Sequence, residues 1–176
     1  MKIYTIGHSA HPIERFINLL KMYNIQTIVD VRSVPHSRYH PQFRKGILER
    51  ELNAVGIGYV FLGQKLGGRP DDPDCYPEGV QPSSEIQPWP KPDYEKVMAQ
   101  AGFQEGIVEL LEIVSQKRTV ILCSEENPAS CHRHGLIALY LKRNHPEIQI
   151  MHIRGNGVLV EAAEIDVQTG QQSSFL

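Results

Sequence analysis

The stretch from Cys123 to Arg133 holds a dense set of reactive side chains. It offers two thiols, two carboxylates, an imidazole and a guanidinium in the order Cys-Ser-Glu-Glu-Asn-Pro-Ala-Ser-Cys-His-Arg. An apolar, β-branched run, 119–122, precedes it, and an apolar helical pattern, 136–141, follows it. This order predicts a turn from a strand into a helix, and open α/β sheets bind ligands at the carboxyl ends of strands. We therefore expect the functional site here.

Cys131 is the candidate nucleophile, because a thiolate near a helix start is stabilised by free backbone N–H groups. If Ser130 caps the helix, Cys131 lies in the first turn. If Asn127 caps it and Pro128 is the first helical residue, Cys131 lies a turn deeper and is less activated. The second start is favoured. Cys123 follows an apolar strand, and the favoured interpretation is a small core residue.

His132 precedes Arg133, which disfavours the protonated imidazole, and a neutral imidazole can act as a general base or a metal ligand. A zinc set could be drawn from Cys123, Cys131, His132 and either Glu125 or His8. However, Cys-x7-Cys-His is not a standard structural zinc spacing, and adjacent helical residues face different ways. The sequence therefore predicts no metal ligands. His134, one turn after Cys131, is expected on the helix surface.

Polar residues also follow the other predicted strands. His8 ends the first strand, Asp30 and Arg32 end the second, and Tyr59 lies in the third. Asp30 and Arg32 share one face of their strand, so Asp30 either orients the arginine or takes part in acid–base chemistry. The loop that carries Arg38 is rich in cations and aromatic residues, which suits recognition of phosphate or carboxylate. An anionic ligand would be held by Arg32, Arg38, Arg69 and Arg133.

Alternating strand and helix patterns position these residues. Strands are expected at 3–6, 26–32, 57–62, 118–123 and 148–153, and helices at 12–23, 45–54, 94–114 (broken near Gly102 or divided in two) and from Cys131 to before Pro146. The alternation predicts a single α/β domain over 1–176, with a mostly parallel sheet of about five strands flanked by helices in a Rossmann-like, three-layer arrangement. Residues 70–92, with seven prolines, are expected to form a loop or lid. Residues 155–176 form a C-terminal extension with a short hairpin or an edge strand.

The composition is that of a globular protein. The chain has 176 residues, of which 41% are hydrophobic and 22% charged, and its net charge is −2. This charge argues against extensive binding to nucleic acid or to anionic membrane. No apolar run approaches the ~20 residues of a membrane helix. Three cysteines and no apparent targeting leader lead us to expect a reduced, cytoplasmic protein.

Several motifs occur in order along the chain. They are Tyr4-Thr-Ile-Gly7-His8-Ser9, Val29-Asp30-Val-Arg32-x-x-Pro35-x-Ser37-Arg38, Leu52-x-x-x-Gly56-Ile57-x-Tyr59, Leu66-Gly67-Gly68 and Cys123-x-Glu125-x-x-Pro128-x-x-Cys131-His132-Arg133. With these motifs, residues from about 3 to 154 resemble the "domain of unknown function 488" family. The resemblance implies a single-domain α/β fold and no established activity. Function must therefore be argued from the residues themselves.

Two functions follow from this pattern. The first is an enzyme, a hydrolase or transferase, acting on an anionic small molecule that bears phosphate or resembles a nucleotide. Its catalytic residues would be Cys131, His132, Glu125 and Asp30, and its substrate-binding residues His8, Arg32, Arg38, Tyr59 and Arg133. The alternative is a non-catalytic module that binds a nucleotide or nucleic acid through the loop 38–44. The pattern identifies neither a cofactor nor an oligomeric state.

Overall fold

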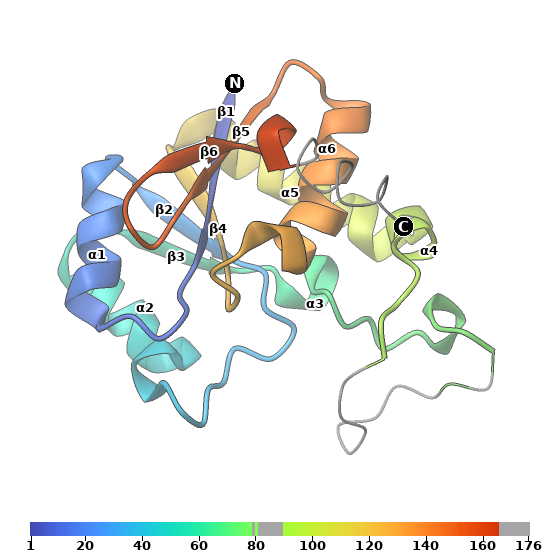
Figure 1. Cartoon of the computed structure of the whole chain (residues 1–176), viewed down its shortest axis with the longest axis horizontal. Helices are drawn as coiled ribbons and strands as arrows, with labels where there is room; N and C mark the ends of the chain where they lie inside the picture. The colour runs from blue at the N-terminus through green and yellow to red at the C-terminus, as the bar shows by residue number, and fades with distance from the viewer. Residues whose placement is uncertain (79, 81–89, 166–176) are drawn as a thin grey trace, which may run out of the picture.

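The computed structural model describes residues 1–78, 80 and 90–165, and this part of the chain forms one sheet of six strands (Figure 1). The spatial order is β3-β2-β4-β1-β5-β6. The strands are β1 (Lys2–Gly7), β2 (Thr27–Asp30), β3 (Gly58–Phe61), β4 (Thr119–Cys123), β5 (Gln149–Ile153) and β6 (Leu159–Glu161). The first five pair in parallel, as predicted. β6, from the C-terminal extension, pairs antiparallel with β5 at the sheet edge, and residues 166–176 lie outside the described part.

Helices cover both faces of the sheet, which confirms the three-layer arrangement (Figure 1). One face carries α1 (Ile13–Met22) and α2 (Lys45–Ala54), and the other carries α3 (Gly63–Leu66), α4 (Tyr94–Ala99), α5 (Ala101–Gln116), the π-helix η4 (Arg133–Ala138) and α6 (Leu139–Asn144). The expected helix over 94–114 is two helices, separated at Gln100 rather than at Gly102. No helix of the described residues is both long and apolar enough to cross a membrane.

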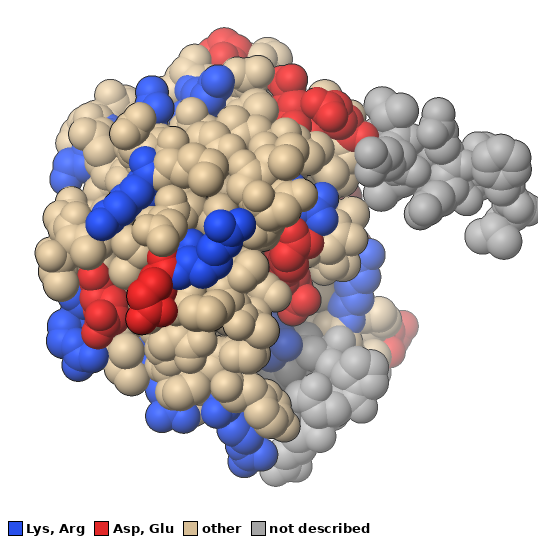
Figure 2. All heavy atoms as spheres, turned by 60° about the vertical axis from the view of Figure 1, so that its left-hand side comes forward, with Lys and Arg blue, Asp and Glu red and all other residues tan. Residues whose placement is uncertain are grey.

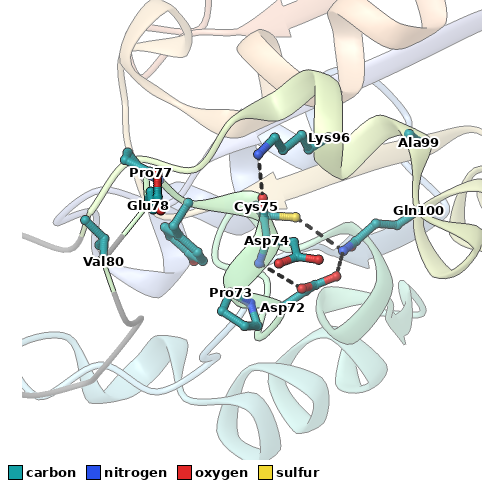
Figure 3. A pocket seen from close by; sticks show the side chains of 11 residues that line it. Asp72, Pro73, Asp74, Cys75, Pro77, Glu78, Val80, Lys96, Ala99 and Gln100 are labelled. Carbon is teal, nitrogen blue, oxygen red and sulfur yellow. Dashed lines mark hydrogen bonds between the residues drawn. The ribbon is translucent and has the colours of Figure 1, made fainter.

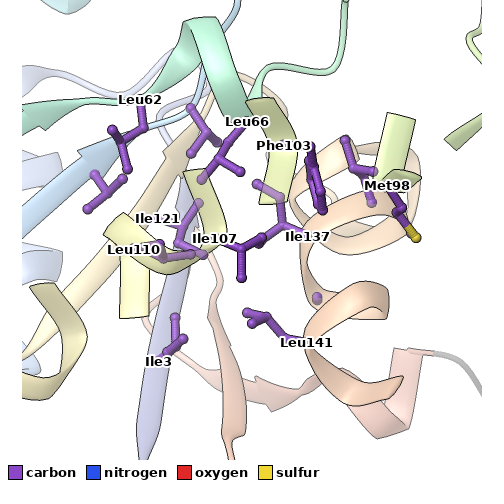
Figure 4. Packing of buried hydrophobic residues seen from close by; sticks show 14 of the residues in the cluster. Ile3, Leu62, Leu66, Met98, Phe103, Ile107, Leu110, Ile121, Ile137 and Leu141 are labelled. Atoms are coloured by element: carbon purple, nitrogen blue, oxygen red, sulfur yellow. The ribbon is translucent and has the colours of Figure 1, made fainter. Parts of the chain in front are cut away.

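Alternation along the strands supplies two hydrophobic cores. In β4, Ile121 points to the core under α3 to α6, whereas Val120 and Leu122 point to the core under α1 and α2. Figure 4 shows the first of these cores, where Phe103 and Ile107 of α5 pack beside residues of the sheet and of the helices that follow β4. The buried interior of β1, β2 and β4 therefore fixes the place where the carboxyl ends of these strands emerge.

Two histidines lie in the interior. The Nδ1 atom of His152 is 2.7 Å from Thr5 Oγ1, and its Nε2 atom is 3.1 Å from His134 Nδ1. The prediction that His134 faces solvent was wrong, because η4 packs so closely on the sheet that five of its six residues are buried. A sequence window shows the amphipathic stripe but not how wide the buried face is.

The chain diverges at the carboxyl ends of the neighbouring strands β2 and β4. After β2 it continues to α2 on one face, and after β4 it continues to η4 and α6 on the opposite face. Such a switch point leaves a crevice between the two outgoing loops, and ligands of open α/β sheets bind in this position. The loops that border it contain Arg32 and the Cys123–Arg133 stretch.

Candidate functional site

Two adjoining hollows open at this switch point. The larger, of about 660 Å³, is the thiol cleft, and its lining includes Cys123, Cys131 and His132. The smaller, of about 320 Å³, is the His8 hollow. The two share four lining residues, which are Arg32, His36, Ser124 and Glu125. The loop after β2 and the loop after β4 therefore build one continuous, two-part site.

Cys123 and His132 form a thiol–imidazole pair in the thiol cleft. Cys123 Sγ lies 3.5 Å from His132 Nδ1, and His132 Nε2 lies 3.1 Å from the carbonyl oxygen of Val31. Because a carbonyl only accepts hydrogen bonds, Nε2 carries the hydrogen and donates it. In the tautomer that this bond selects, Nδ1 is the nitrogen that faces the thiol, as a general base requires.

The second thiol, Cys131, supports the first. A hydrogen bond from Cys131 lowers the pKa of Cys123, and the Arg133 charge and the amides of Ser124 and Glu125 act in the same direction, although burial opposes them. The same hydrogen bond, with burial, raises the pKa of Cys131 to about 12. Of the two sulfurs, Cys123 is therefore the one that the structure favours as a thiolate.

The local backbone explains how both thiols reach one point. The side chain of Asn127 caps a helix, as predicted, but this helix is the short 3₁₀ segment η3 (Pro128–Ser130). The chain then becomes extended at Cys131, whose carbonyl accepts hydrogen bonds from the amides of His134 and Gly135 at the start of the next helix. Cys131 thus lies between two helices and not one turn deep in a single helix, so its side chain and that of His132 converge.

Arg133 organises the loop from behind. Its side chain is fully buried, and its two terminal nitrogens donate to the backbone carbonyls of Glu125 and Glu126. It lines neither hollow. The structure therefore places this guanidinium where it holds the loop after β4 in shape, and not where it would touch a ligand in the cleft.

Asp30 and Arg32 form a buried ion pair at the end of β2. Arg32 donates from Nε and Nη2 to the carboxylate, with Nη2–Oδ2 at 2.6 Å, and from Nη1 to the carbonyl of Phe43. Tyr59 donates its hydroxyl to the same carboxylate at 2.6 Å. Asp30 thus orients the arginine, as one of the two predicted roles requires. These bonds hold the guanidinium from three sides, and Arg32 lines both hollows.

His8 contributes a neutral imidazole to the smaller hollow. Its ring stacks on Phe43 with centroids 4.3 Å apart, and Nδ1 lies 2.8 Å from the carbonyl oxygen of Ser9. Burial lowers the pKa of His8 to about 4. Nδ1 therefore carries the hydrogen, and the buried Nε2 has no hydrogen-bond partner among the described residues. This nitrogen can accept a hydrogen bond but does not carry a positive charge near neutral pH.

The structure separates the nine predicted site residues into three groups. Five line the site, namely His8, Arg32, Glu125, Cys131 and His132. Asp30, Tyr59 and Arg133 lie behind the wall and hold other residues in place. Arg38 belongs to the same loop as His36 but lines neither hollow. The two ends of the proline-rich segment 70–92 border the thiol cleft through Arg69, Pro90, Lys91 and Pro92, whereas residues 79 and 81–89 of the expected lid lie outside the described part.

Sequence reasoning placed Cys123 in the core and did not single out His36, Ser124, Lys91 or Tyr94. One feature of the sequence could have placed Cys123 in the site. It is the last residue of a predicted parallel strand, and ligands bind at the carboxyl ends of such strands. The other four residues come from loops whose course is set by tertiary contacts, so local patterns carry no signal for them.

A third hollow lies away from the strand ends, beside η2 (Pro73–Cys75) and α4, and is shown in Figure 3. Its polar groups bind one another: Gln100 Nε2 donates to Asp72 at 2.7 Å and contacts the Cys75 sulfur at 3.2 Å, and Lys96 donates to the Asp74 carbonyl. These groups attach the proline-rich segment to α4. These internal hydrogen bonds favour a structural role for this hollow over a catalytic role.

The exposed face that includes α1 and α2 shows acidic and basic side chains interspersed (Figure 2). No broad basic track is visible on the described part of that face. A track of this kind is the usual footprint of proteins that bind the nucleic-acid backbone.

One family model matches the chain, over residues 12–140, and its description is "Domain of unknown function DUF488". The matched range contains the loop after β2 and the whole Cys123–Arg133 stretch, whereas His8 precedes it. No curated protein and no solved structure matches the chain.

Proposed function

Because this chain belongs to the family described as domain of unknown function DUF488, a description without an activity, we propose its function from the cleft itself. The chain is a thiol-dependent hydrolase or transferase that acts on an anionic substrate at the carboxyl ends of β2 and β4. The observation that carries this proposal is the contact between Cys123 Sγ and His132 Nδ1, in which the Nε2–H group of His132 donates a hydrogen bond to the Val31 carbonyl. Nucleophile, base and orienting group are the three elements of a covalent catalytic site.

The reaction follows from these contacts. Cys123 passes its proton to His132 Nδ1, and the sulfur attacks the electrophilic centre of the substrate. His132 returns the proton to the leaving group, which leaves the transferred group bound to sulfur. Water or a second acceptor then attacks this group and gives its proton to His132. The bond to sulfur breaks, and His132 returns the proton to the Cys123 thiolate. We assign the nucleophile to Cys123 rather than to Cys131, because the sulfur of Cys123 lies 3.5 Å from His132 Nδ1.

The anionic character of the substrate is supported by the cations in the wall. Arg32, Arg69 and Lys91 line the thiol cleft, and Arg32 is held in a fixed orientation by Asp30. The planar guanidinium group matches the spacing of two oxygens of a phosphate or carboxylate. Glu125, the acidic residue of the same lining, is left to contact a donor group of the substrate or the water of the second step.

The test compares two alkylating reagents of similar size, the anionic iodoacetate and the neutral iodoacetamide, on the folded protein. Mass spectrometry of the digested protein gives the labelling rate of each cysteine. We expect Cys123 to react first, with a preference for iodoacetate and protection by inorganic pyrophosphate. Replacing His132 by Ala should slow the reaction by about 100-fold, as general-base catalysis predicts. Cys75, which lies in the third hollow, is the internal control.

Equal rates for Cys123 and Cys75 would refute the nucleophile. Protection by pyrophosphate without any effect of the His132 substitution would leave a site that binds anions but does not activate a thiol. That result would favour the non-catalytic nucleotide-binding module over the enzyme.

A further inference from the structure

Three potential metal ligands meet at the floor of the thiol cleft. The sulfurs of Cys123 and Cys131 and a ring nitrogen of His132 all lie within 4.8 Å of one another. The sequence argued against such a set because neighbouring helical residues diverge. The extended backbone at Cys131 removes that objection, since Cys131 lies outside the helix that His132 begins.

We propose that Cys123, Cys131 and His132 bind one thiophilic divalent cation such as Zn²⁺. The distances support this assignment. Zinc–sulfur and zinc–nitrogen bonds of about 2.3 Å and 2.05 Å, at a tetrahedral angle, separate the two ligand atoms by about 3.6 Å. The distance between Cys123 Sγ and His132 Nδ1 is 3.5 Å. Two thiolates on one tetrahedral zinc are separated by about 3.8 Å. The Cys131 sulfur lies within 4.8 Å of both other ligand atoms, so a movement of at most about 1 Å brings it to this separation.

The surroundings of His132 suit a ligand. Metal-bound histidines donate their other ring N–H to a carbonyl or carboxylate, which fixes the tautomer and orients the lone pair. The Val31 carbonyl accepts this hydrogen bond from Nε2 at 3.1 Å, so Nδ1 is the atom that faces the sulfurs. Two thiolates neutralise the charge of the cation. The thiol cleft leaves a fourth position for water or for an anion held by Arg32.

The metal site does not depend on the proposed function, although it involves the same atoms; only its effect on the thiol reaction rests on that function. A cation bound to Cys123 occupies the sulfur lone pair that the covalent reaction requires. One molecule therefore cannot use Cys123 as ligand and as nucleophile at the same time. We infer that a thiophilic cation switches off the thiol reaction reversibly, and that a chelator restores it.

The test titrates the reduced, full-length protein with Co²⁺ alone, and follows the thiolate-to-cobalt charge-transfer absorption; Zn²⁺ is then added as a competitor. We expect one ion per chain, displaced by Zn²⁺. Replacing Cys123 or Cys131 by Ser, or His132 by Ala, should weaken binding by at least about 100-fold, whereas Cys75→Ser should leave it unchanged. Circular dichroism checks that each variant is folded.

A second measurement needs no variant. In the wild-type protein, Zn²⁺ should block alkylation of Cys123 and Cys131 but not of Cys75, and a chelator should reverse the block. No thiolate-to-cobalt band in the folded protein, or a band that persists in Cys123→Ser, would overturn the metal site. These outcomes leave the proposed function standing, because that proposal is tested on the metal-free thiol.

Discussion

Replacing Asp30 by Asn should destabilise the fold strongly while leaving the thiol chemistry in place. The Asp30 carboxylate is fully buried and accepts from the backbone N–H of Arg32, from Arg32 Nε and Nη2, and from the hydroxyl of Tyr59. An amide keeps one acceptor oxygen and turns an NH₂ group toward these donors. The Arg32 guanidinium, only 4% exposed, then loses its counter-charge.

The size of the effect follows from that burial. Removing one partner of a buried ion pair costs about 3–5 kcal/mol, because the other charge stays desolvated and unpaired. For a chain of this length, 1 kcal/mol corresponds to roughly 2–4 °C in the melting temperature, so the midpoint should fall by roughly 6–20 °C.

Thermal and urea unfolding of both proteins would measure this loss. Glu51→Gln is the matched control, because its partner Arg50 is 71% exposed and such surface pairs contribute at most about 1 kcal/mol. Labelling of Cys123 by iodoacetamide, measured below the melting transition, should change little. An Asp30→Asn protein that is as stable as the wild type but no longer activates Cys123 would show that Asp30 takes part in the chemistry, and would refute the orienting role.

Two further predictions concern pH and the position of His132. The hydrogen bond from Arg154 lowers the pKa of Glu126 from its usual 4.5 to about 2. The ionised Glu126 carboxylate therefore adds to the unfolding free energy above pH 4.5, and this contribution is lost as the pH falls toward 2. The difference in unfolding free energy between wild type and Glu126→Gln should shrink over that range. At Gly68, an added Cβ would lie 2.6 Å from Cγ of His132, so Gly68→Ala should displace the imidazole and slow labelling of Cys123. Gly46→Ala, whose Cβ would meet nothing within 4 Å, should leave the rate unchanged.

Hydrophobic periodicity predicted most of the elements. The expected helix at 45–54 coincides with α2. The five expected strands coincide with β1 to β5, and every strand end agrees within two residues. The strand ends also predicted the edge of the sheet at which the two hollows lie. These features follow from local sequence because the helices show an apolar face with a helical period, and the central strands are short, continuous apolar runs.

The roles within the site could not be predicted in the same way. Arginine is a residue type that often binds anionic ligands, but the guanidinium of Arg133 donates hydrogen bonds to two loop carbonyls. The sequence around Cys123 predicts a core residue, because the cleft beside it is built in part by a loop distant in sequence, which contains Val31 and Arg32. Whether a polar side chain faces a ligand or a neighbouring backbone depends on tertiary contacts that no sequence window contains.

The buried Arg133 has a consequence for local opening of the protein. It joins the carbonyls of Glu125 and Glu126 to η4, which packs on the sheet, so the loop cannot move away without uncovering a buried guanidinium. The loop and the helix therefore form one cooperative unit. In hydrogen exchange, we expect the protected amides at the start of η4 to become accessible together with this loop and not before it. The wall of the cleft on this side is then as rigid as the helix that follows it.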